Sequence, residues 1–510
     1  MGSLKRIFNN LFALVVANIT MVANQLLLPP IFLHQYGIAL YGEWLALSVG
    51  VAYLRTLNFG VQTYVNQDLA LRFHRGEIEG YHVRQSTALR LLLGICGGAA
   101  LLSPIIFLLP ISHILRLSIS NQQATLATFL LAMQVLVNIL FGYFSGIFMV
   151  IEKAHRGTQW NNGQRMLFIL ATVGAILLHV SFAMLAFVQL ATYAVVFVAV
   201  MIDLKRTAPQ IFPNVKHWDR SSVSEILKRS GHFGLIYSCT FLAFEAPVLV
   251  LQRIVGPASV VAFTLMRTIF SMGRQILAVL TQSLGPEITA LFGKRDWRQL
   301  RTLYGYSEQL IFACIPTVNL AILVASPWLL SVWRVNKSGM FQLYPYVVCA
   351  AISIVMATEE HKYQFQFATN SHEKLARFMF GSYLVMVTCS IPLVRIFGIM
   401  GFLGIWLVTE VAQLIYIVHL NHQLFDTSVT GVEKLTLRNL TRMLALSLAG
   451  LVAAGATLRY TAAAGHGLQI ASTIATVVLV GGVSYLLFDL RYVAGGFVRR
   501  IRGRFAQQQS

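Results

Sequence analysis

The chain has 510 residues, of which 56% are hydrophobic and only 11% are charged. Soluble domains carry about 25% charged residues, so this composition excludes a soluble globular protein of this length and an intrinsically disordered chain. It predicts a protein whose surface mostly faces lipid.

A membrane-spanning helix needs about 20 mostly apolar residues. Fourteen such stretches follow one another along the chain, at 7–33, 41–64, 87–110, 124–150, 165–180, 182–202, 232–253, 259–282, 307–332, 341–366, 376–396, 399–420, 439–458 and 468–488. The first is not a cleaved signal peptide, because it is too long, contains Pro29-Pro30 and has no small-residue cleavage site after it. We therefore expect an all-α polytopic membrane protein with about 14 transmembrane helices.

The basic residues predict how these spans are oriented. With the N-terminus inside, 29 of the 39 Lys and Arg residues fall on the inner side. Four lie within spans, and the outer side carries only Arg116, Arg253, Arg334, Lys337, Arg395 and Arg459. Because basic residues accumulate in cytoplasmic loops, both termini are expected to be cytoplasmic. The net charge of +20 then reflects orientation, and no nucleic-acid partner is expected.

The longest hydrophilic link, at 203–231, separates the first six spans from the next six. We predict an N-lobe at 1–202, a cytoplasmic inter-lobe linker at 203–231 and a C-lobe at 232–420. Two additional spans at 421–488 and a basic cytoplasmic tail at 489–510 follow, and the tail is expected to contact anionic headgroups. With six spans in each lobe, the two lobes would be parallel repeats.

Three segments carry family motifs. They are Gln25-Leu-Leu-Leu-Pro29 with Tyr36-Gly37 and Tyr41-Gly42; Asn58-Phe-Gly-Val-Gln-Thr-Tyr-Val-Asn66; and Gly256–Arg267 continuing to Leu284-Gly-Pro-Glu287 and Lys294-Arg-Asp296. These segments resemble polysaccharide flippases of the Wzx type, which belong to the MOP superfamily of multidrug, oligosaccharidyl-lipid and polysaccharide exporters. The resemblance extends to the order and arrangement of the predicted spans over roughly residues 1–420.

The resemblance implies two lobes arranged as in MATE and other MOP proteins. It also implies translocation of an undecaprenyl-diphosphate-linked oligosaccharide from the cytoplasmic to the periplasmic leaflet of a bacterial inner membrane. Transport would proceed by alternating access, coupled to an ion gradient, in O-antigen or exopolysaccharide biosynthesis. The implied partners are the lipid-linked glycan, membrane lipids, and polysaccharide polymerase and export proteins.

No catalytic constellation is present in the sequence. There is no GxxxxGK[ST], HExxH or GxSxG motif, and the five cysteines form no CxxC or Cys/His spacing. We therefore expect a secondary transporter rather than an enzyme, without cofactor or metal.

Three arginines are predicted to bind the diphosphate. A charged side chain at membrane depth costs about 2.5–3.5 kcal/mol, so it usually faces a cavity or a partner. Arg267 and Arg274 are seven residues apart on one face of the eighth span, and Arg55 lies in the second span. Guanidinium groups bind phosphate oxygens bidentately. The alternative is a structural role, in which each arginine pairs with a helix-end carbonyl or extends to the interface.

Four further ionisable residues are predicted to couple an ion or to form salt bridges in a cleft: Glu245, Glu410, Glu360 and Lys362. Glu245 precedes Pro247 and is expected to pair with Arg267 or to carry a proton. Five amides within the spans are candidate sugar contacts or helix-to-helix hydrogen bonds: Gln25, Asn58, Gln62, Gln134 and Asn138.

Other functions predict different features of the sequence. A lipid II flippase of the MurJ kind would carry similar arginines, and a multidrug or cation antiporter of the MATE kind should have an acidic cleft. A glycan polymerase or ligase would need a large external loop, whereas the predicted outer loops are short. The polar residues at mid-membrane argue against a purely structural subunit.

Overall fold

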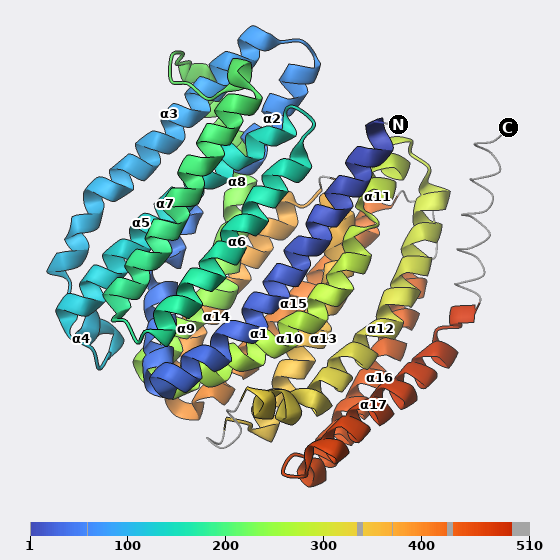
Figure 1. Cartoon of the computed structure of the whole chain (residues 1–510). Coiled ribbons are helices and arrows are strands. Elements are labelled where there is room, and N and C mark those ends of the chain that lie inside the picture. Colours follow the sequence, from blue (N-terminus) through green and yellow to red (C-terminus); the bar gives the residue numbers. More distant parts are fainter. Residues whose placement is uncertain (1, 59, 334–339, 370, 426–431, 492–510) are drawn as a thin grey trace. The chain divides into compact units, whose positions relative to one another are not determined.

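Helices form every regular element in the part of the chain that the computed structural model describes, residues 2–58, 60–333, 340–369, 371–425 and 432–491 (Figure 1). In chain order they are α1 (Gly2–Gly50), η1 (Ala52–Asn58), α2 (Val61–His74), α3 (Ile78–Leu102), η2 (Ser103–Leu108), α4 (Ile111–Leu115), α5 (Asn121–Gly146), η3 (Ile147–Met149), α6 (Ala154–Leu177), α7 (Phe182–Thr207), η4 (Pro209–Ile211), α8 (Arg220–Thr240), η5 (Phe241–Glu245), α9 (Ala246–Ile254), α10 (Pro257–Gln282), α11 (Gly285–Gly293), α12 (Trp297–Val332), α13 (Leu343–Ala368), α14 (Glu373–Phe397), α15 (Ile399–Leu424), α16 (Val432–Thr461) and α17 (His466–Leu487). The predicted all-α fold is confirmed.

Twelve helical stretches among the described residues are long and apolar enough to cross a membrane, and the chain is a multi-pass membrane protein. The predicted number was about 14, and two features account for the difference. The first two predicted spans fall largely in the 40-residue stretch 19–58, which counts once although the helix is kinked at Gly37. The fifth predicted span is α6, whose first half is polar and which is not among the twelve.

Gly37 bends α1. Its backbone is non-helical, with φ 75° and ψ 177°, a conformation that only glycine adopts without strain. Beyond the bend, Gly42 packs against Pro257 so closely that a Cβ at Gly42 would lie 2.4 Å from the proline carbonyl oxygen. Two of the segments singled out from the sequence therefore meet directly.

The chain divides by its contacts into two units, Met1–Val261 and Ala262–Ser510. This boundary lies after α9, so α8 and α9 group with the N-terminal helices. The lobes and linker predicted from the sequence place these helices in the second lobe, and that assignment stays a prediction.

In the N-terminal unit, α5 packs along α7, and α1 packs along α6 and α9. Side-chain caps fix where these helices begin. The hydroxyls of Ser120 and Ser181 accept from the third backbone N–H of α5 and α7, each at 3.3 Å. Asp219 caps α8 by accepting from the backbone N–H groups of Ser221 and Ser222, at 3.1 and 2.9 Å.

A charged network joins α2, α3 and α8 at one end of this unit. Arg84 is only 3% exposed and pairs with Asp68 at 2.9 Å and with Glu225. Asp68 also accepts from Arg72 at 3.0 Å, and Glu225 pairs with Arg229 at 3.1 Å. Hydrogen bonding to the Arg84 guanidinium holds the pKa of Glu225 below its ordinary value.

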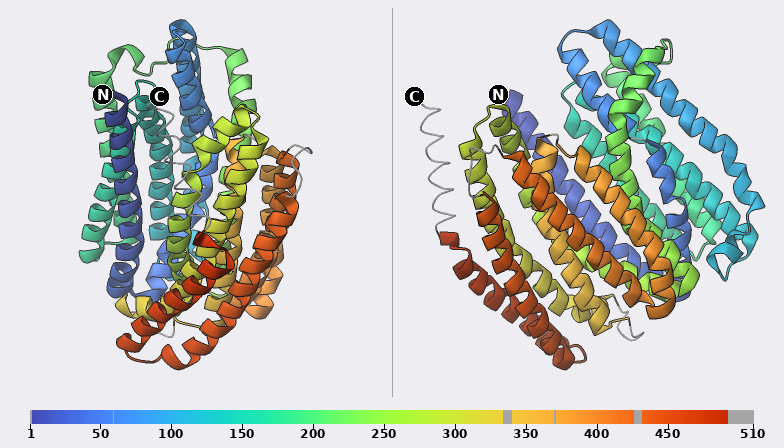
Figure 2. Two further views of the ribbon diagram at one scale, coloured as in Figure 1. Left: turned by 90° about the vertical axis from the view of Figure 1, so that its right-hand side faces the viewer. Right: turned by 180° about the vertical axis from the view of Figure 1, so that it is seen from behind.

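In the C-terminal unit, α12 packs against α13, α16 and α17, and α15 packs against α13 and α14. Figure 2 shows α16 and α17 beside α12. Aromatic rings fill the contact between α12 and α13, where the ring of Tyr304 lies 4.8 Å from Phe365 and 5.2 Å from Phe425.

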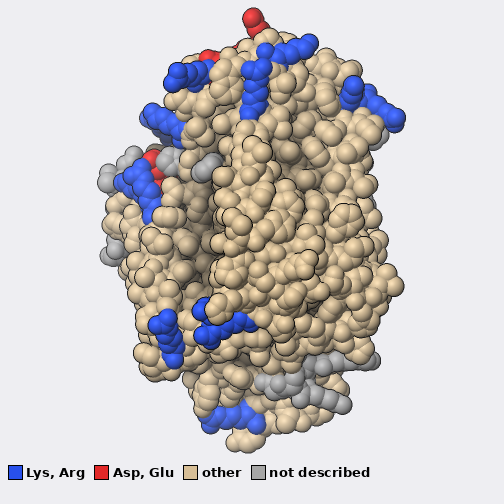
Figure 3. Space-filling model, turned by 90° about the vertical axis from the view of Figure 1, so that its left-hand side faces the viewer, with Lys and Arg blue, Asp and Glu red and all other residues tan. Residues whose placement is uncertain are grey.

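The exposed surface is that of a membrane protein. Large apolar side chains are exposed along α3 and α17, among them Leu101, Leu102, Val478, Leu479 and Leu486. On the face drawn in Figure 3, basic side chains gather toward the two ends, and the surface between them carries almost no charge. Exposed apolar surface of this extent is stable in lipid but not in water.

Candidate functional site

Four consecutive polar residues on α13, Glu359-Glu360-His361-Lys362, organise the buried charges of the C-terminal unit. Successive helical residues point about 100° apart, so each reaches a different neighbour. His361 meets the hydroxyl of Ser307 on α12 at 2.9 Å. The other three contact separate groups on α10, α12 and α15.

Lys362 forms an ion pair with Glu308 of α12, and both side chains are completely buried. The ammonium also donates to the Tyr304 hydroxyl at 2.6 Å. Glu308 accepts further hydrogen bonds from Thr436 at 3.1 Å and Asn439 at 2.7 Å, both on α16. The pair therefore fastens α16 to α12 and α13. Glu308 was not identified from the sequence.

Glu359 and Glu410 form a carboxyl pair between α13 and α15, at 1% and 0% exposure. The two carboxyl groups interact electrostatically across the contact between the helices. Two neighbouring carboxylates repel each other, and one proton on the pair would remove that repulsion. Glu410 also accepts from Trp406 Nε1 at 2.7 Å and from the Tyr383 hydroxyl at 3.1 Å. The sequence suggested Glu410 but not its partner.

Arg274 of α10 lies near this carboxyl pair, and its charge interacts with Glu410 and Glu360. Its Nη1 also approaches Met356 Sδ at 3.0 Å. Glu360 hydrogen-bonds to Gln282 of α10. The structure thus brings together three of the residues singled out from the sequence, Arg274, Glu360 and Glu410.

Arg267, two helical turns before Arg274, lies over the ring of Phe263 at 5.6 Å. The two arginines line a cavity whose other walls are Phe270, Cys349, Ile352, Ser353, Met356 and Trp406. Its volume is about 10 Å³, room for about one water at most. No carboxylate lines this cavity.

Arg55 and Glu245 lie in the N-terminal unit. Arg55 is exposed on η1, and Glu245 is partly buried at the end of the π-helix η5. Pro247 has no N–H to continue the helical ladder, which explains the change from α8 through η5 to α9. Because Arg267 belongs to the other unit, its pairing with Glu245 and its position opposite Arg55 stay predictions.

The predicted amides differ in their contacts. Asn58 donates to Gln62 Oε1 at 2.9 Å and accepts from its backbone N–H at 3.2 Å. Gln62 also donates to the carbonyl of Ile139, which ties α2 to α5. Gln25 on α1 is partly buried, as are Gln134 and Asn138 on α5. The helix-to-helix alternative therefore accounts for Gln62, while binding of sugar by these five residues stays a prediction.

Among the described residues, no three His, Cys, Asp or Glu side chains come together in a way that could hold a metal ion. The charged groups of the site described above are the arginines of α10 and the Glu359–Glu410 carboxyl pair.

Solved structures share this fold. The inward-facing conformation of a multidrug resistance MATE family transporter of the MOP superfamily matches with a TM-score of 0.65 and 15% identity, over 82% of this chain and 100% of that chain. An outward-facing MATE transporter matches with a TM-score of 0.55 and 16% identity, over 82% and 94%. The lipid II flippase MurJ, in an inward closed conformation, matches with a TM-score of 0.58 and 10% identity, over 97% and 100%.

No protein-family model and no curated protein matches the chain. At 10 to 16% identity the structural matches show the fold alone, and the predicted MATE/MOP-like fold is confirmed.

Proposed function

We propose that this protein is a flippase that moves an undecaprenyl-diphosphate-linked oligosaccharide from the cytoplasmic to the periplasmic leaflet by alternating access. The observation that carries the proposal is the pair Arg267 and Arg274, which line a small cavity without a carboxylate in its walls. Guanidinium groups are suited to phosphate oxygens, whereas a site for a cationic drug would be lined by acids. The neighbours' transport activities support a transporter rather than an enzyme.

The carboxyl pair gives this proposal a coupling step. With its proton, the Glu359–Glu410 pair carries one negative charge; without it, the pair would carry two. Loss of the proton would strengthen the attraction between the pair and Arg274, which already interacts with Glu410. The deprotonated pair would then compete with the diphosphate for Arg274, and protonation would release the arginine to bind substrate.

The small volume of this cavity is consistent with alternating access. About 10 Å³ cannot admit a diphosphate, so substrate binding requires the helices around Arg267 to move apart. We propose that this motion opens the site toward one leaflet at a time.

A bacterial inner membrane with both termini cytoplasmic is the location we propose, because the basic residues are concentrated on one side of the predicted spans. The proposed partners are the lipid-linked glycan, surrounding lipids, and polysaccharide polymerase and export proteins.

A lipid II flippase is the second candidate. The MurJ structure covers 97% of this chain, whereas the MATE structures above cover 82%. Both candidate substrates carry a polyprenyl diphosphate, so the arginines serve either one. The peptide on lipid II distinguishes them in a competition assay.

Binding to the purified, full-length protein in nanodiscs tests the proposal. We expect undecaprenyl-diphosphate-linked N-acetylglucosamine to bind more tightly than undecaprenol or a hydrophobic cation. Arg267→Gln and Arg274→Gln should each weaken binding at least tenfold, which corresponds to about 1.4 kcal/mol. Arg298→Gln is the matched control, because Arg298 is exposed on α12. Preferential binding of the cation, or equal binding by all variants, would refute the proposal.

A further inference from the structure

A pocket of about 360 Å³ lies within the N-terminal unit, between α2, α5, η3 and α6. Its polar lining consists of the side chains of Asn66, Gln67, Ser145, Thr158 and Asn161, and the other walls are glycine, alanine and methionine. None of these residues is charged. The volume falls within the ~300–1,000 Å³ typical of small-molecule sites.

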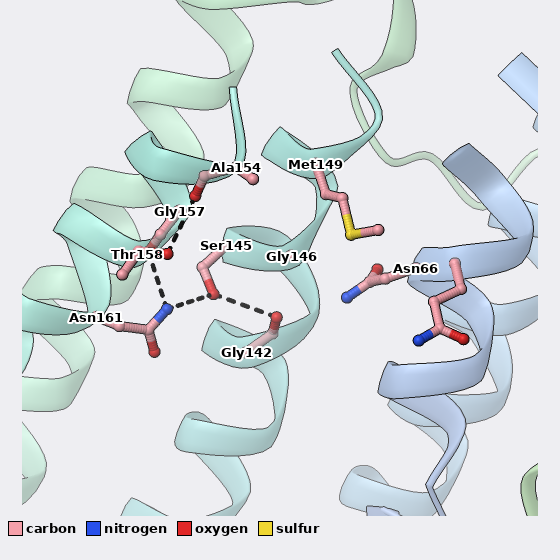
Figure 4. A pocket seen from close by; sticks show the side chains of 10 residues that line it. Asn66, Gly142, Ser145, Gly146, Met149, Ala154, Gly157, Thr158 and Asn161 are labelled. Atoms are coloured by element: carbon pink, nitrogen blue, oxygen red, sulfur yellow. Dashed lines mark hydrogen bonds between the residues drawn. The ribbon is translucent and has the colours of Figure 1, made fainter. Parts of the chain in front are cut away.

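Glycines allow the walls of the pocket to approach one another closely. A Cβ at Gly157 would lie 2.4 Å from the backbone oxygen of Ser145, so α6 approaches α5 backbone to backbone. A Cβ at Gly146 would lie 1.8 Å from Asn66 Nδ2, so the amide of Asn66 lies directly over the bare backbone of α5. Figure 4 shows this amide pointing toward Gly146 and Met149.

Asn66 has hydrogen-bonding capacity that the protein does not use. Its Oδ1 is buried without a hydrogen-bond partner. A buried polar atom left in this state costs about 1–3 kcal/mol, and a bound ligand that donates a hydrogen bond would recover that cost.

The facing wall is held in place by its own hydrogen bonds. Asn161 Nδ2 donates to the carbonyl of Gly157 at 2.9 Å and contacts Ser145 Oγ at 3.4 Å (Figure 4). Ser145 Oγ donates to the carbonyl of Gly142 at 3.2 Å. The amide and hydroxyl groups are therefore fixed before any ligand arrives, which limits the entropy lost on binding.

We propose that this pocket binds a neutral sugar ring of the lipid-linked glycan. The inference rests on the proposed function and adds to it a place for the sugar. Amides and hydroxyls both donate and accept, as sugar hydroxyls do, and the lack of charged groups separates this pocket from the diphosphate site. It opens where α5 ends and α6 begins, which is the cytoplasmic end in the proposed orientation, where the glycan is presented.

Binding of undecaprenyl diphosphate, bare or carrying glucose, galactose or N-acetylglucosamine, to the full-length protein in nanodiscs tests the inference. At least one of the sugar-carrying lipids should bind more tightly than bare undecaprenyl diphosphate. Asn66→Leu and Asn161→Leu should each reduce that gain about tenfold while leaving binding of the bare lipid unchanged. Gln159→Leu is the matched control, because Gln159 is exposed and does not line the pocket.

A positional readout keeps the test independent of affinity. Met149 lines the pocket and is 43% exposed, so a thiol in Met149→Cys should be protected from maleimide by the sugar lipid but not by the bare lipid. A thiol in Glu79→Cys, exposed near the start of α3, should react equally with both lipids present. Absence of any gain from a sugar, or a gain that survives in both leucine variants, overturns the sugar pocket. Absence of any diphosphate-dependent binding overturns the proposed function instead.

Discussion

Lys362→Met is expected to destabilise the protein by about 3 kcal/mol. Breaking a buried ion pair by removing one partner costs about 3–5 kcal/mol, because the other charge remains in a low-dielectric interior. The substitution leaves the Glu308 carboxylate fully buried and removes the 2.6 Å bond to Tyr304. Thr436 and Asn439 still donate to Glu308, which places the cost at the lower end of that range.

The double variant Lys362→Met/Glu308→Gln removes both charges, and glutamine can still accept from Thr436 and Asn439. We expect its free energy of unfolding to be only about 1.5 kcal/mol lower than that of the wild type, because replacing a buried ion pair by uncharged groups often changes stability little. Glu308→Gln alone should likewise cost about 3 kcal/mol, so the double variant should lose about 4.5 kcal/mol less than the two single variants combined, and this difference is the coupling energy.

The assay is reversible unfolding in mixed micelles by increasing the proportion of sodium dodecyl sulfate, followed by tryptophan fluorescence. Lys294→Met provides the control. Because Lys294 is exposed, this substitution should change the free energy of unfolding by no more than about 0.5 kcal/mol. If the double variant loses as much as the sum of the two single variants, the pair does not act as a coupled unit and the reasoning fails.

Gly157→Ala should lower the free energy of unfolding by about 1–3 kcal/mol, because the added Cβ would meet the Ser145 backbone. Gly163→Ala on the same helix places its Cβ in open space and should not lower it. Equal effects of the two substitutions in the same titration would contradict this packing. Arg84 holds the pKa of Glu225 low in the folded state. The stabilisation by this carboxylate is therefore fully present when the pH is above the pKa of Glu225 in the unfolded chain, near 4.5, and it is lost as the pH falls through the lower pKa of the folded state. The stability difference between wild type and Arg84→Gln, measured by thermal unfolding, should therefore shrink on acidification, and a difference independent of pH would argue against the Arg84 network.

Hydropathy predicted most of the helices because length and apolar composition are local properties. The number of stretches that are long and apolar enough to cross a membrane differs from the predicted number of spans at α1 and α6. Gly37 breaks the helical backbone of α1 and leaves a sharp kink, so the first two predicted spans follow each other with no loop between them. The fifth predicted span belongs to α6, whose first half is polar and which packs against α1 and α7, contacts that local composition does not indicate.

The candidate site was predictable only in part. An acid or base within an apolar span marks a position that needs a partner, and Lys362 and Glu410 were found in this way. Their partners lie 54 and 51 residues away in the sequence, at Glu308 and Glu359, and helix packing determines which groups meet. Glu308 carried the same sequence signal as Glu410, an acid inside an apolar span.

The sugar pocket was less visible still. Gly142 and Gly146 are four residues apart on α5, a spacing that allows close helix approach but does not identify the opposite helix. Asn66 becomes informative only when its amide is found over Gly146.

Transport in proteoliposomes tests the central claim most directly. The protein is reconstituted, a fluorescent undecaprenyl-diphosphate-linked N-acetylglucosamine is placed in the membrane, and its accessibility to an external quencher is followed under an imposed pH gradient. We predict transport that is accelerated by the gradient and falls at least tenfold in Arg267→Gln and Arg274→Gln, while Arg298→Gln retains the wild-type rate. Wild-type rates in both cavity variants, or transport of a hydrophobic cation in place of the lipid, would contradict the account.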